Sequence, residues 1–300
     1  MEEIERIHAR LENVKAIEPI LSALRTIAGA TWRAALKRRG GLEEYASQLE
    51  EVLTIIAPYL PPENRPEGER TKHDDNEALL VISAERGLCG SFNRTVLEAA
   101  EDFIAREQAE GRSLQLLTLG EKARQRFERL EMPILRAESL PVTSLLPFAR
   151  AEALAHWILD AYERGEISGL QVIYNQYISA VACAPTVRRL LPPLLAVQVP
   201  EEQVWPPPII ETDPVVIHEL VIKQLVAVQL YAAVIESAAS EQAARLQAME
   251  RSSQNAERLI EELSLSYHQA RQEAITQEML DLVAGAGMLA GASEEGNYYG

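Results

Sequence analysis

The longest uninterrupted helical pattern in the chain covers residues 213–289 and reads DPVVIHELVIKQLVAVQLYAAVIESAASEQAARLQAMERSSQNAERLIEELSLSYHQARQEAITQEMLDLVAGAGML. Asp213 is a good N-cap, and Pro214 suits the first helical position because its missing N–H has no intrahelical acceptor there. After Pro214, neither proline nor glycine occurs before Gly285. We therefore predict a single helix across this stretch.

Apolar side chains recur along this helix in alternating steps of four and three residues. Of these positions, Gln242 and Ser253 are the polar ones. The full set is Val221, Leu225, Val228, Ala232, Ile235, Ala239, Gln242, Leu246, Met249, Ser253, Ala256, Ile260, Leu263, Tyr267, Ala270 and Ala274. A repeat of 3.5 residues predicts a seam against a partner helix. Several of these side chains are small, so the partner can approach closely.

The first segment of the chain, residues 2–57, has the same kind of pattern and is the expected antiparallel partner. Its positions at every seventh residue are Ile7, Val14, Leu21, Ala28, Ala35, Leu42, Leu49 and Ile56. The companion positions drift around the helix, as a straight helix does relative to a strict heptad, and they are Ile4, Leu11, Ile17, Leu24, Tyr45 and Val52. Pro19 is expected to kink this helix or to mark its effective start, and Gly40-Gly41 is a second weak point.

The middle of the chain predicts a linker and an α/β domain. Residues 58–76 combine prolines with charges and few apolar side chains, as a linker does. Strands are expected at 77–83, 114–119, 133–135, 170–179 and 181–191, with helices at 91–110, 121–130 and 147–164. This alternation indicates a small, mostly parallel sheet covered on both faces within a domain of residues 77–205. The C-terminal helical region is placed at 206–289, and a flexible, glycine-rich tail at 290–300.

Composition narrows the class of protein. The chain is 47% apolar, which is enough to bury a folded core. The net charge of −16 disfavours binding to nucleic acid or to an anionic bilayer, so protein partners are expected. Cys89 and Cys183 have no metal or disulfide spacing and are interpreted as reduced thiols. The charged, periodic N-terminus is no signal peptide, and without a run of eighteen apolar residues no membrane insertion is expected.

The turn after the first strand is the place where a dinucleotide would bind, but it fits poorly. The turn from Gly87 to Asn93 has Gly-x-x-Gly spacing, with no third glycine and no acidic residue after the second strand. Cys89 could be a low-pKa thiol at a helix N-terminus, but no histidine lies in a recognisable triad context. His218 has no second metal ligand near it in the sequence. We therefore expect no cofactor, no metal and no catalytic residue in this chain.

Three stretches resemble one protein family. Residues 81–93, VISAERGLCGSFN, resemble the Ser/Thr-Asp-Arg-Gly-Leu-Cys-Gly-x-x-Asn strand and turn of the gamma subunit of F-type ATP synthases. Residues 236–249, ESAASEQAARLQAM, are similar to that family's Ala-Ser-Glu-x-Ala-Ala-Arg-Met-x-Ala-Met segment. Residues 267–279, YHQARQEAITQEM, followed by VAGA at 283–286, are similar to its C-terminal Asn-x-x-Arg-Gln-x-x-Ile-Thr-x-Glu motif. The resemblance covers nearly the whole chain.

This resemblance implies an α/β plus coiled-coil fold, in which the N- and C-terminal helices form an antiparallel coiled coil with a central Rossmann-like α/β domain at its foot. It implies the central rotor shaft of a proton-transporting F-type ATP synthase, with catalysis on the alpha and beta subunits. The foot would contact the epsilon subunit and the membrane ring of c subunits, peripherally at the cytoplasmic face of the cell membrane. The matching positions that the family uses near the catalytic subunits are Arg245, Arg271, Gln272, Thr276 and Glu278.

The sequence departs from the family in its N-terminal helix. Where the family pattern resembles Lys-Ile-Thr-Lys-Ala-Met-x-Met-Val-Ala-Ala-Ser-Lys, this chain reads PILSALRTIAGAT, so that Pro19, Ser22 and Thr31 replace three lysines. If those lysines steer the shaft against acidic loops of the beta subunit, steering here must be weaker, or Arg25 and Arg33 must compensate. Two alternatives stay open: a non-rotary gamma-like scaffold or regulatory paralogue that binds coiled-coil partners, and a nucleotide-binding enzyme built on the α/β domain.

Overall fold

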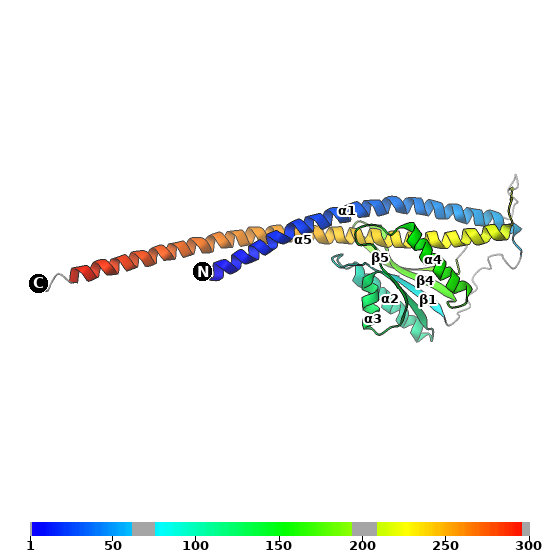
Figure 1. Ribbon diagram of the computed structural model, residues 1–300, viewed down its shortest axis with the longest axis horizontal. Helices are drawn as coiled ribbons and strands as arrows, with labels where there is room; N and C mark the ends of the chain where they lie inside the picture. The colour runs from blue at the N-terminus through cyan, green and yellow to red at the C-terminus, as the bar shows by residue number, and fades with distance from the viewer. Residues whose placement is uncertain (1, 62–75, 194–208, 296–300) are drawn as a thin grey trace. The chain divides into compact units, whose positions relative to one another are not determined.

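The computed structural model describes residues 2–61, 76–193 and 209–295, and the side chains of residues 3–284 within those ranges. It divides into two compact units. The first unit contains residues 1–25 and 249–300, and the second contains residues 26–248. Helix α1 (Glu2–Ile56) and helix α5 (Pro214–Glu295) each contribute to both units, and within each unit they run side by side (Figure 1).

The second unit is built on a five-stranded sheet with the order β3-β2-β1-β4-β5. The strands are β1 (Glu77–Ile82), β2 (Leu114–Leu119), β3 (Ile134–Glu138), β4 (Gly169–Ser179) and β5 (Ala182–Leu191). The first four strands in this order pair in parallel, and β5 pairs antiparallel with β4. Every side chain of β1 is buried. Because successive side chains point to opposite faces of a sheet, both faces are covered here, as the sequence predicted.

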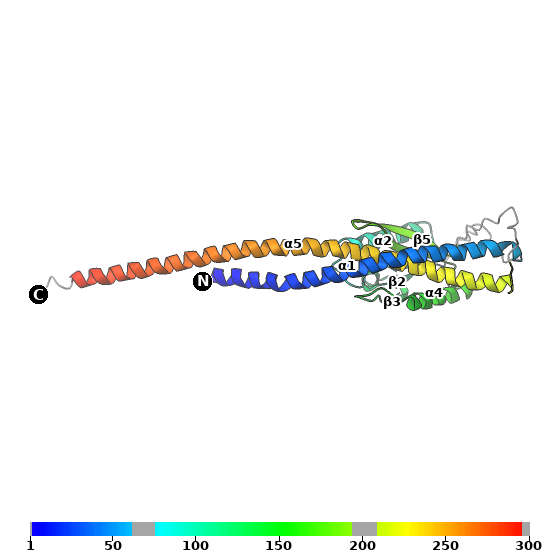
Figure 2. The same cartoon turned by 90° about the horizontal axis from the view of Figure 1, so that it is seen from above.

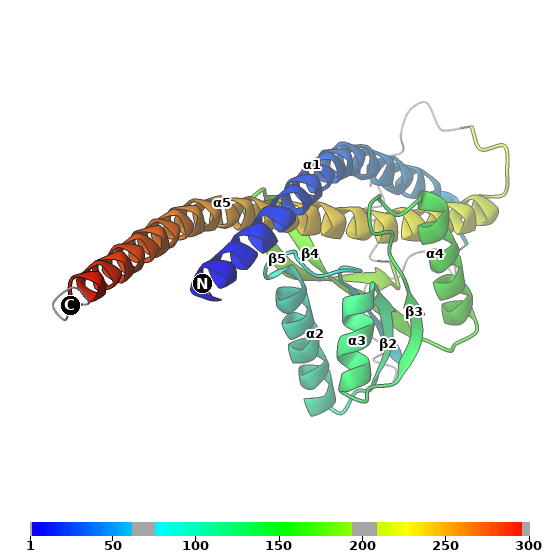
Figure 3. The same cartoon turned by 60° about the vertical axis from the view of Figure 1, so that its left-hand side comes forward.

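Each face of the sheet has its own helical cover. Helices α2 (Phe92–Ala109) and α3 (Glu121–Arg129) pack on the face that carries Leu79 and Val81 (Figure 3). Helices α4 (Phe148–Glu163) and α5 pack on the other face, around Leu80 and Ile82. Ala35 of α1 belongs to that second cluster. Helix α5 is therefore both a core helix of the α/β domain and one helix of the coiled coil.

The predicted seam of α5 is buried in the second unit. Leu225, Val228, Ile235 and Ala239 are fully buried. Of the α1 positions, Ala35 packs in one cluster with Ile235 and Ala239, and Leu49 and Ile56 pack with Leu225 and Val228. By length and composition alone, α5 is apolar enough to cross a membrane. Within it, buried residues between Leu225 and Ile235 pack against the sheet and α1.

The first unit is an antiparallel pair of helices. Arg25 lies 2.9 Å from Glu250, and the rings of His8 and Tyr267 lie 5.2 Å apart. The partner on α5 thus moves toward the C-terminus as α1 is read toward its N-terminus (Figure 2). Leu11, Met249, Ser253 and Ala256 are buried in this pair. The heptad pattern predicted the partner, and the antiparallel direction was expected on the condition that the intervening segment returns the chain to its starting point.

Several predicted boundaries were wrong. Helix α1 runs from Glu2 through Pro19 without a break, so Pro19 does not mark its start. Helix α5 continues to Glu295, six residues past the predicted end, so the residues from 290 to 295 are helical. Strand β3 is longer than predicted and ends at Glu138. After α1 the chain forms a short 3₁₀ turn, Ala57–Tyr59. The rest of the predicted linker, from 62 to 75, and the last tail residues, 296–300, lie outside the described residues.

Candidate subunit-contact site

In the first unit, α5 continues past the end of its partner helix. Helix α1 begins at Glu2, less than two turns before His8, so its cover of α5 ends within about two turns after Tyr267. Every side chain from Ile275 to Ala284 is exposed, and we call these residues the α5 tip. Its large apolar side chains are 52% to 73% exposed, and they are Ile275, Met279, Leu280, Leu282 and Val283. A contiguous apolar surface of this kind marks a protein interaction site.

Four of the five predicted contact residues lie on or directly before the α5 tip. Arg271, Gln272, Thr276 and Glu278 are all exposed. Arg271 and Ile275 are four residues apart, as are Thr276 and Leu280, so polar and apolar side chains share the same helix faces. Thr276 Oγ1 donates to the Gln272 carbonyl at 2.8 Å. The segment offers a guanidinium, an amide and a carboxylate beside apolar surface, which suits a partner with both kinds of group.

Arg245, the fifth predicted residue, lies in the second unit and contacts its own chain. Its side chain is only 11% exposed, and Nη2 lies 2.6 Å from Glu241 Oε1. The same nitrogen donates to the Gly87 carbonyl at 3.4 Å. Arg245 therefore fastens α5 to the turn that follows β1, and the structure does not group it with the other four.

That turn lies at the switch point of the sheet, between β1 and β4, where an α/β domain of this topology would bind a ligand. Here the position is filled by the protein. Asn175 Nδ2 donates to the Phe92 carbonyl at 2.8 Å, and both residues are buried. The Asn93 amide accepts from the Ala84 N–H at 2.9 Å. Cys89 is 2% exposed and packs with Phe92 against α5.

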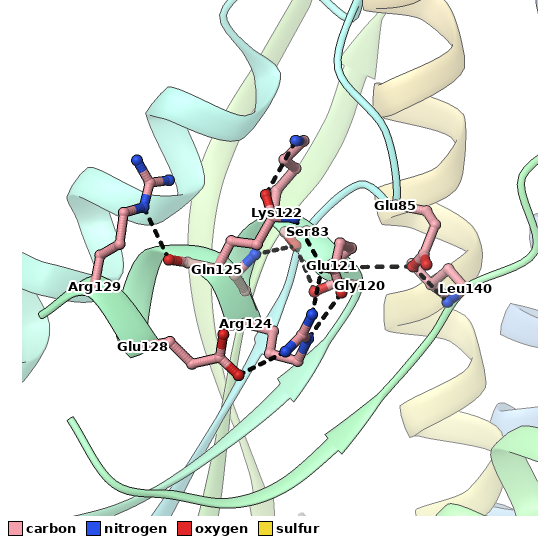
Figure 4. Close-up of polar contacts among 11 residues, drawn as sticks. Ser83, Glu85, Gly120, Glu121, Lys122, Arg124, Gln125, Glu128, Arg129 and Leu140 are labelled. Atoms are coloured by element: carbon pink, nitrogen blue, oxygen red, sulfur yellow. Dashed lines mark hydrogen bonds and ion pairs between the residues drawn. The ribbon is translucent and has the colours of Figure 1, made fainter. Parts of the chain in front are cut away.

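The N-terminus of α3 is also capped by the chain itself (Figure 4). The Glu85 carboxylate accepts from the Glu121 N–H at 3.2 Å and from the Leu140 N–H at 2.9 Å. Ser83 Oγ accepts from the Ala123 N–H at 2.8 Å. Free amides at such a helix start would attract a phosphate. In this chain a carboxylate and a hydroxyl already occupy them.

The ionisable groups around the turn are not tuned for nucleophilic chemistry. Burial, followed by the negative charge of Glu241, raises the pKa of Cys89 to about 11, so the thiol stays protonated at neutral pH. Burial also raises the pKa of Glu241, against the opposing effect of Arg245. Away from the turn, near the start of α5, burial lowers the pKa of His218. Within the described part of the chain, no three His, Cys, Asp or Glu side chains are grouped to hold a metal ion.

Sequence reasoning missed one contact: the segments 81–93 and 236–249, far apart in the chain, touch each other. Ala244 packs against Cys89 and Phe92, and Ser240 Oγ donates to the Asn175 carbonyl at 2.9 Å. The signal was the run of small residues in 236–249, which lets the β1 turn approach the helix. The two segments form one joint between the long helix and the sheet.

A coiled coil whose C-terminal helix also forms part of the core of a Rossmann-like domain, with an exposed apolar tip on that helix, defines a stalk-type subunit. Residues 3–289 match the family model described as ATP synthase. The chain is 30% identical to the ATP synthase gamma chain of Brucella anthropi and 33% identical to that of Nostoc punctiforme, over 95% of this chain and 99% of each relative. The chain belongs to the ATP synthase gamma chain family.

Solved structures share the fold. A chain of the Euglena gracilis mitochondrial ATP synthase, in a structure of its OSCP/F1/c-ring, has a TM-score of 0.64 at 16% identity and covers 100% of this chain and 97% of its own. A chain from the central stalk and c-ring of the Tetrahymena thermophila mitochondrial ATP synthase has a TM-score of 0.57 at 22% identity, covering 77% of this chain and 98% of its own. The predicted fold class is confirmed.

Proposed function

We propose that this gamma subunit is the rotor shaft that couples proton flow through a membrane ring of c subunits to ATP synthesis on alpha and beta subunits. The observation that carries the proposal is the division of α5. One part of this continuous helix is buried in the core of the α/β domain, and another part, the α5 tip, is exposed. Such a helix can receive torque at the domain and present it at the tip.

In this proposal the tip is the contact with the alpha and beta subunits. Its directional polar contacts come from Arg271, Gln272, Thr276 and Glu278. The exposed apolar side chains supply the apolar contact area. Each orientation of the shaft would favour a different set of catalytic-site conformations, which is a coupling of binding free energies. Arg245 acts inside the chain, at the joint with the Gly87 turn.

Catalysis then belongs to the alpha and beta subunits, and this chain contributes no catalytic residue. The filled switch point supports that assignment, since Phe92 and Asn175 take the place of a ligand. We assign the contacts with the epsilon subunit and the c-ring to the α/β domain, at the cytoplasmic face of the membrane. The similar Tetrahymena thermophila chain, from a structure of the central stalk and c-ring, and the resemblance of residues 81–93 support this assignment.

The test is co-expression of this chain with the alpha and beta subunits of its own organism, followed by purification and an ATPase assay. We expect one copy per six-subunit ring, and ATPase activity that depends on the chain. An active ring that excludes the full-length chain would contradict the shaft function.

A further inference from the structure

Two consecutive arginines of α1 reach α5 in the second unit, and each contact continues into the α/β domain. Arg38 Nη1 donates to the Tyr231 hydroxyl at 2.9 Å. That hydroxyl donates in turn to the Leu146 carbonyl at 3.0 Å. Tyr231 is 2% exposed. A continuous polar path therefore leads from α1, through α5, to the segment before α4.

The second path starts at Arg39 and meets a buried carboxylate on α5. Arg39 Nη2 lies 3.3 Å from Glu236 Oε1. The other carboxylate oxygen, Oε2, accepts from the Tyr174 hydroxyl at 2.9 Å. Tyr174 belongs to β4, so one carboxylate joins α1, α5 and the sheet.

The chemistry of this second path requires all three residues. Glu236 is 6% exposed and Tyr174 is fully buried. A buried carboxylate is costly unless it has a cation and hydrogen-bond donors. Arg39 supplies the charge. Burial raises the pKa of Tyr174 to about 12, so its hydroxyl keeps the proton that it donates.

The surrounding interface gives little directional information of its own. Ala35, Ala227, Ala233 and Ala239 are fully buried in the apolar cluster that joins α1, α5 and the sheet, and apolar contacts are non-directional. Directly after the two arginines come Gly40 and Gly41, where an added Cβ would meet none of the described atoms within 4 Å. Packing does not explain these glycines, and they weaken the helix. The polar paths thus hold α1 immediately before the weak point formed by Gly40 and Gly41.

We propose that Arg38 and Arg39 are positioning residues, which fix the rotation of α1 on α5 and fasten both helices to the sheet, so that the shaft turns with the α/β domain as one body. This inference rests on the proposed rotary function. We therefore expect that replacing either arginine weakens the transmission of torque between the shaft and the α/β domain, while the catalytic subunits keep their activity.

The decisive experiment measures protons pumped per ATP hydrolysed by the whole ATP synthase in sealed vesicles. We expect Arg39→Ala to lower this ratio severalfold, with gamma content and ATP hydrolysis retained, and Arg39→Lys to restore most of it. Arg38→Ala should lower it similarly. Lys37→Ala is the matched control, because Lys37 is exposed on the same helix and its loss removes the same charge. A normal ratio in both alanine variants at full gamma content would overturn the inference.

A second measurement covers the case in which Arg39→Ala fails to assemble. Thermal unfolding of the full chain is compared for Arg39→Ala, Tyr174→Phe and the double variant. Because both residues act through Glu236, we expect the shift in Tm of the double variant to be clearly smaller than the sum of the single shifts. Additive shifts would overturn the shared path. Failure of the wild-type chain to join an alpha–beta ring would count against the proposed function. The Tm comparison would still test the shared path, because it uses the full chain alone.

Discussion

Gly120 is the residue at which the sheet tolerates least change. Its φ is +103°, and an added Cβ would lie 2.2 Å from the Ser83 carbonyl oxygen, which is backbone and cannot move aside. We expect Gly120→Ala to lower the free energy of unfolding by about 4 kcal/mol or more. Gly165 is the matched control, since its φ is +72° but the space around it is open. Gly165→Ala should cost only about 1 kcal/mol, measured by denaturant unfolding. Equal losses of unfolding free energy in the two variants would show that backbone conformation, and not the contact with Ser83, causes the loss at Gly120.

Cys89 provides a pH-dependent test of the closed switch point. With its pKa raised to about 11, it carries roughly a hundredfold less thiolate at neutral pH than an ordinary thiol, and it is buried. We expect iodoacetamide to modify the more accessible Cys183 first at pH 7.5. Labelling of Cys89 should rise about tenfold per pH unit up to about pH 10 and level off near its pKa, as long as the chain stays folded. Urea-unfolded protein, in which both thiols react, is the control. Fast labelling of Cys89 at neutral pH would contradict the closed turn.

At the scale of the element, Pro19 and Gly41 test how α1 is held together. Both are exposed within a continuous helix. Pro19→Ala restores an N–H donor toward the Lys15 carbonyl, so we expect a gain of up to about 3 kcal/mol in the stability of α1. Gly41→Ala should gain about 0.5–1 kcal/mol. Amide hydrogen exchange along α1 measures both. Pro19→Ala without any slowing of exchange around Lys15 would show that the helix is already locally rearranged there.

The same helix shows what the sequence can predict. The positions at every seventh residue were placed correctly because burial repeats every 3.5 residues, and each of Ile7, Val14, Leu21 and Ala28 is at least partly buried. Three of the predicted companion positions were wrong, since Ile17, Tyr45 and Val52 are exposed. Pro19 was read as a possible start from local propensity alone. Seam burial on both sides, at Leu11 and Ala28, offsets the local cost of the proline, and no local rule contains that information.

The end of α5 was predicted too early for a related reason. Glycines at 285, 287 and 291 lower helix propensity, but alanines alternate with them and the helix is already nucleated. At the site, the exposed residues Arg271, Gln272, Thr276 and Glu278 followed from the resemblance. The internal role of Arg245 did not, because it depends on a turn more than 150 residues away that only the folded chain brings close.

At the scale of the whole molecule, the proposed function depends on the α5 tip, and a series of truncations isolates it. Stopping the chain after Glu295 removes residues beyond the described helix and should leave proton-driven ATP synthesis unchanged. Stopping after Ala274 keeps every seam position but removes the tip, so we expect synthesis to fall at least tenfold while the helix pair stays folded. Stopping after Ile260 also removes seam positions that cover α1, and should abolish coupling.

The truncation after Ala274 distinguishes between two explanations for the fall in ATP synthesis, loss of the α5 tip and loss of the helix pair. If the tip carries angle-dependent contacts with the alpha and beta subunits, its loss removes the differential binding by which shaft orientation biases the catalytic sites. Synthesis then falls although circular dichroism shows helix content reduced only by the residues removed. Full ATP synthesis by the chain that ends at Ala274 would show that the helix pair, and not the α5 tip, makes the contacts with the alpha and beta subunits. Full synthesis by the chain that ends at Ile260 would contradict the shaft function.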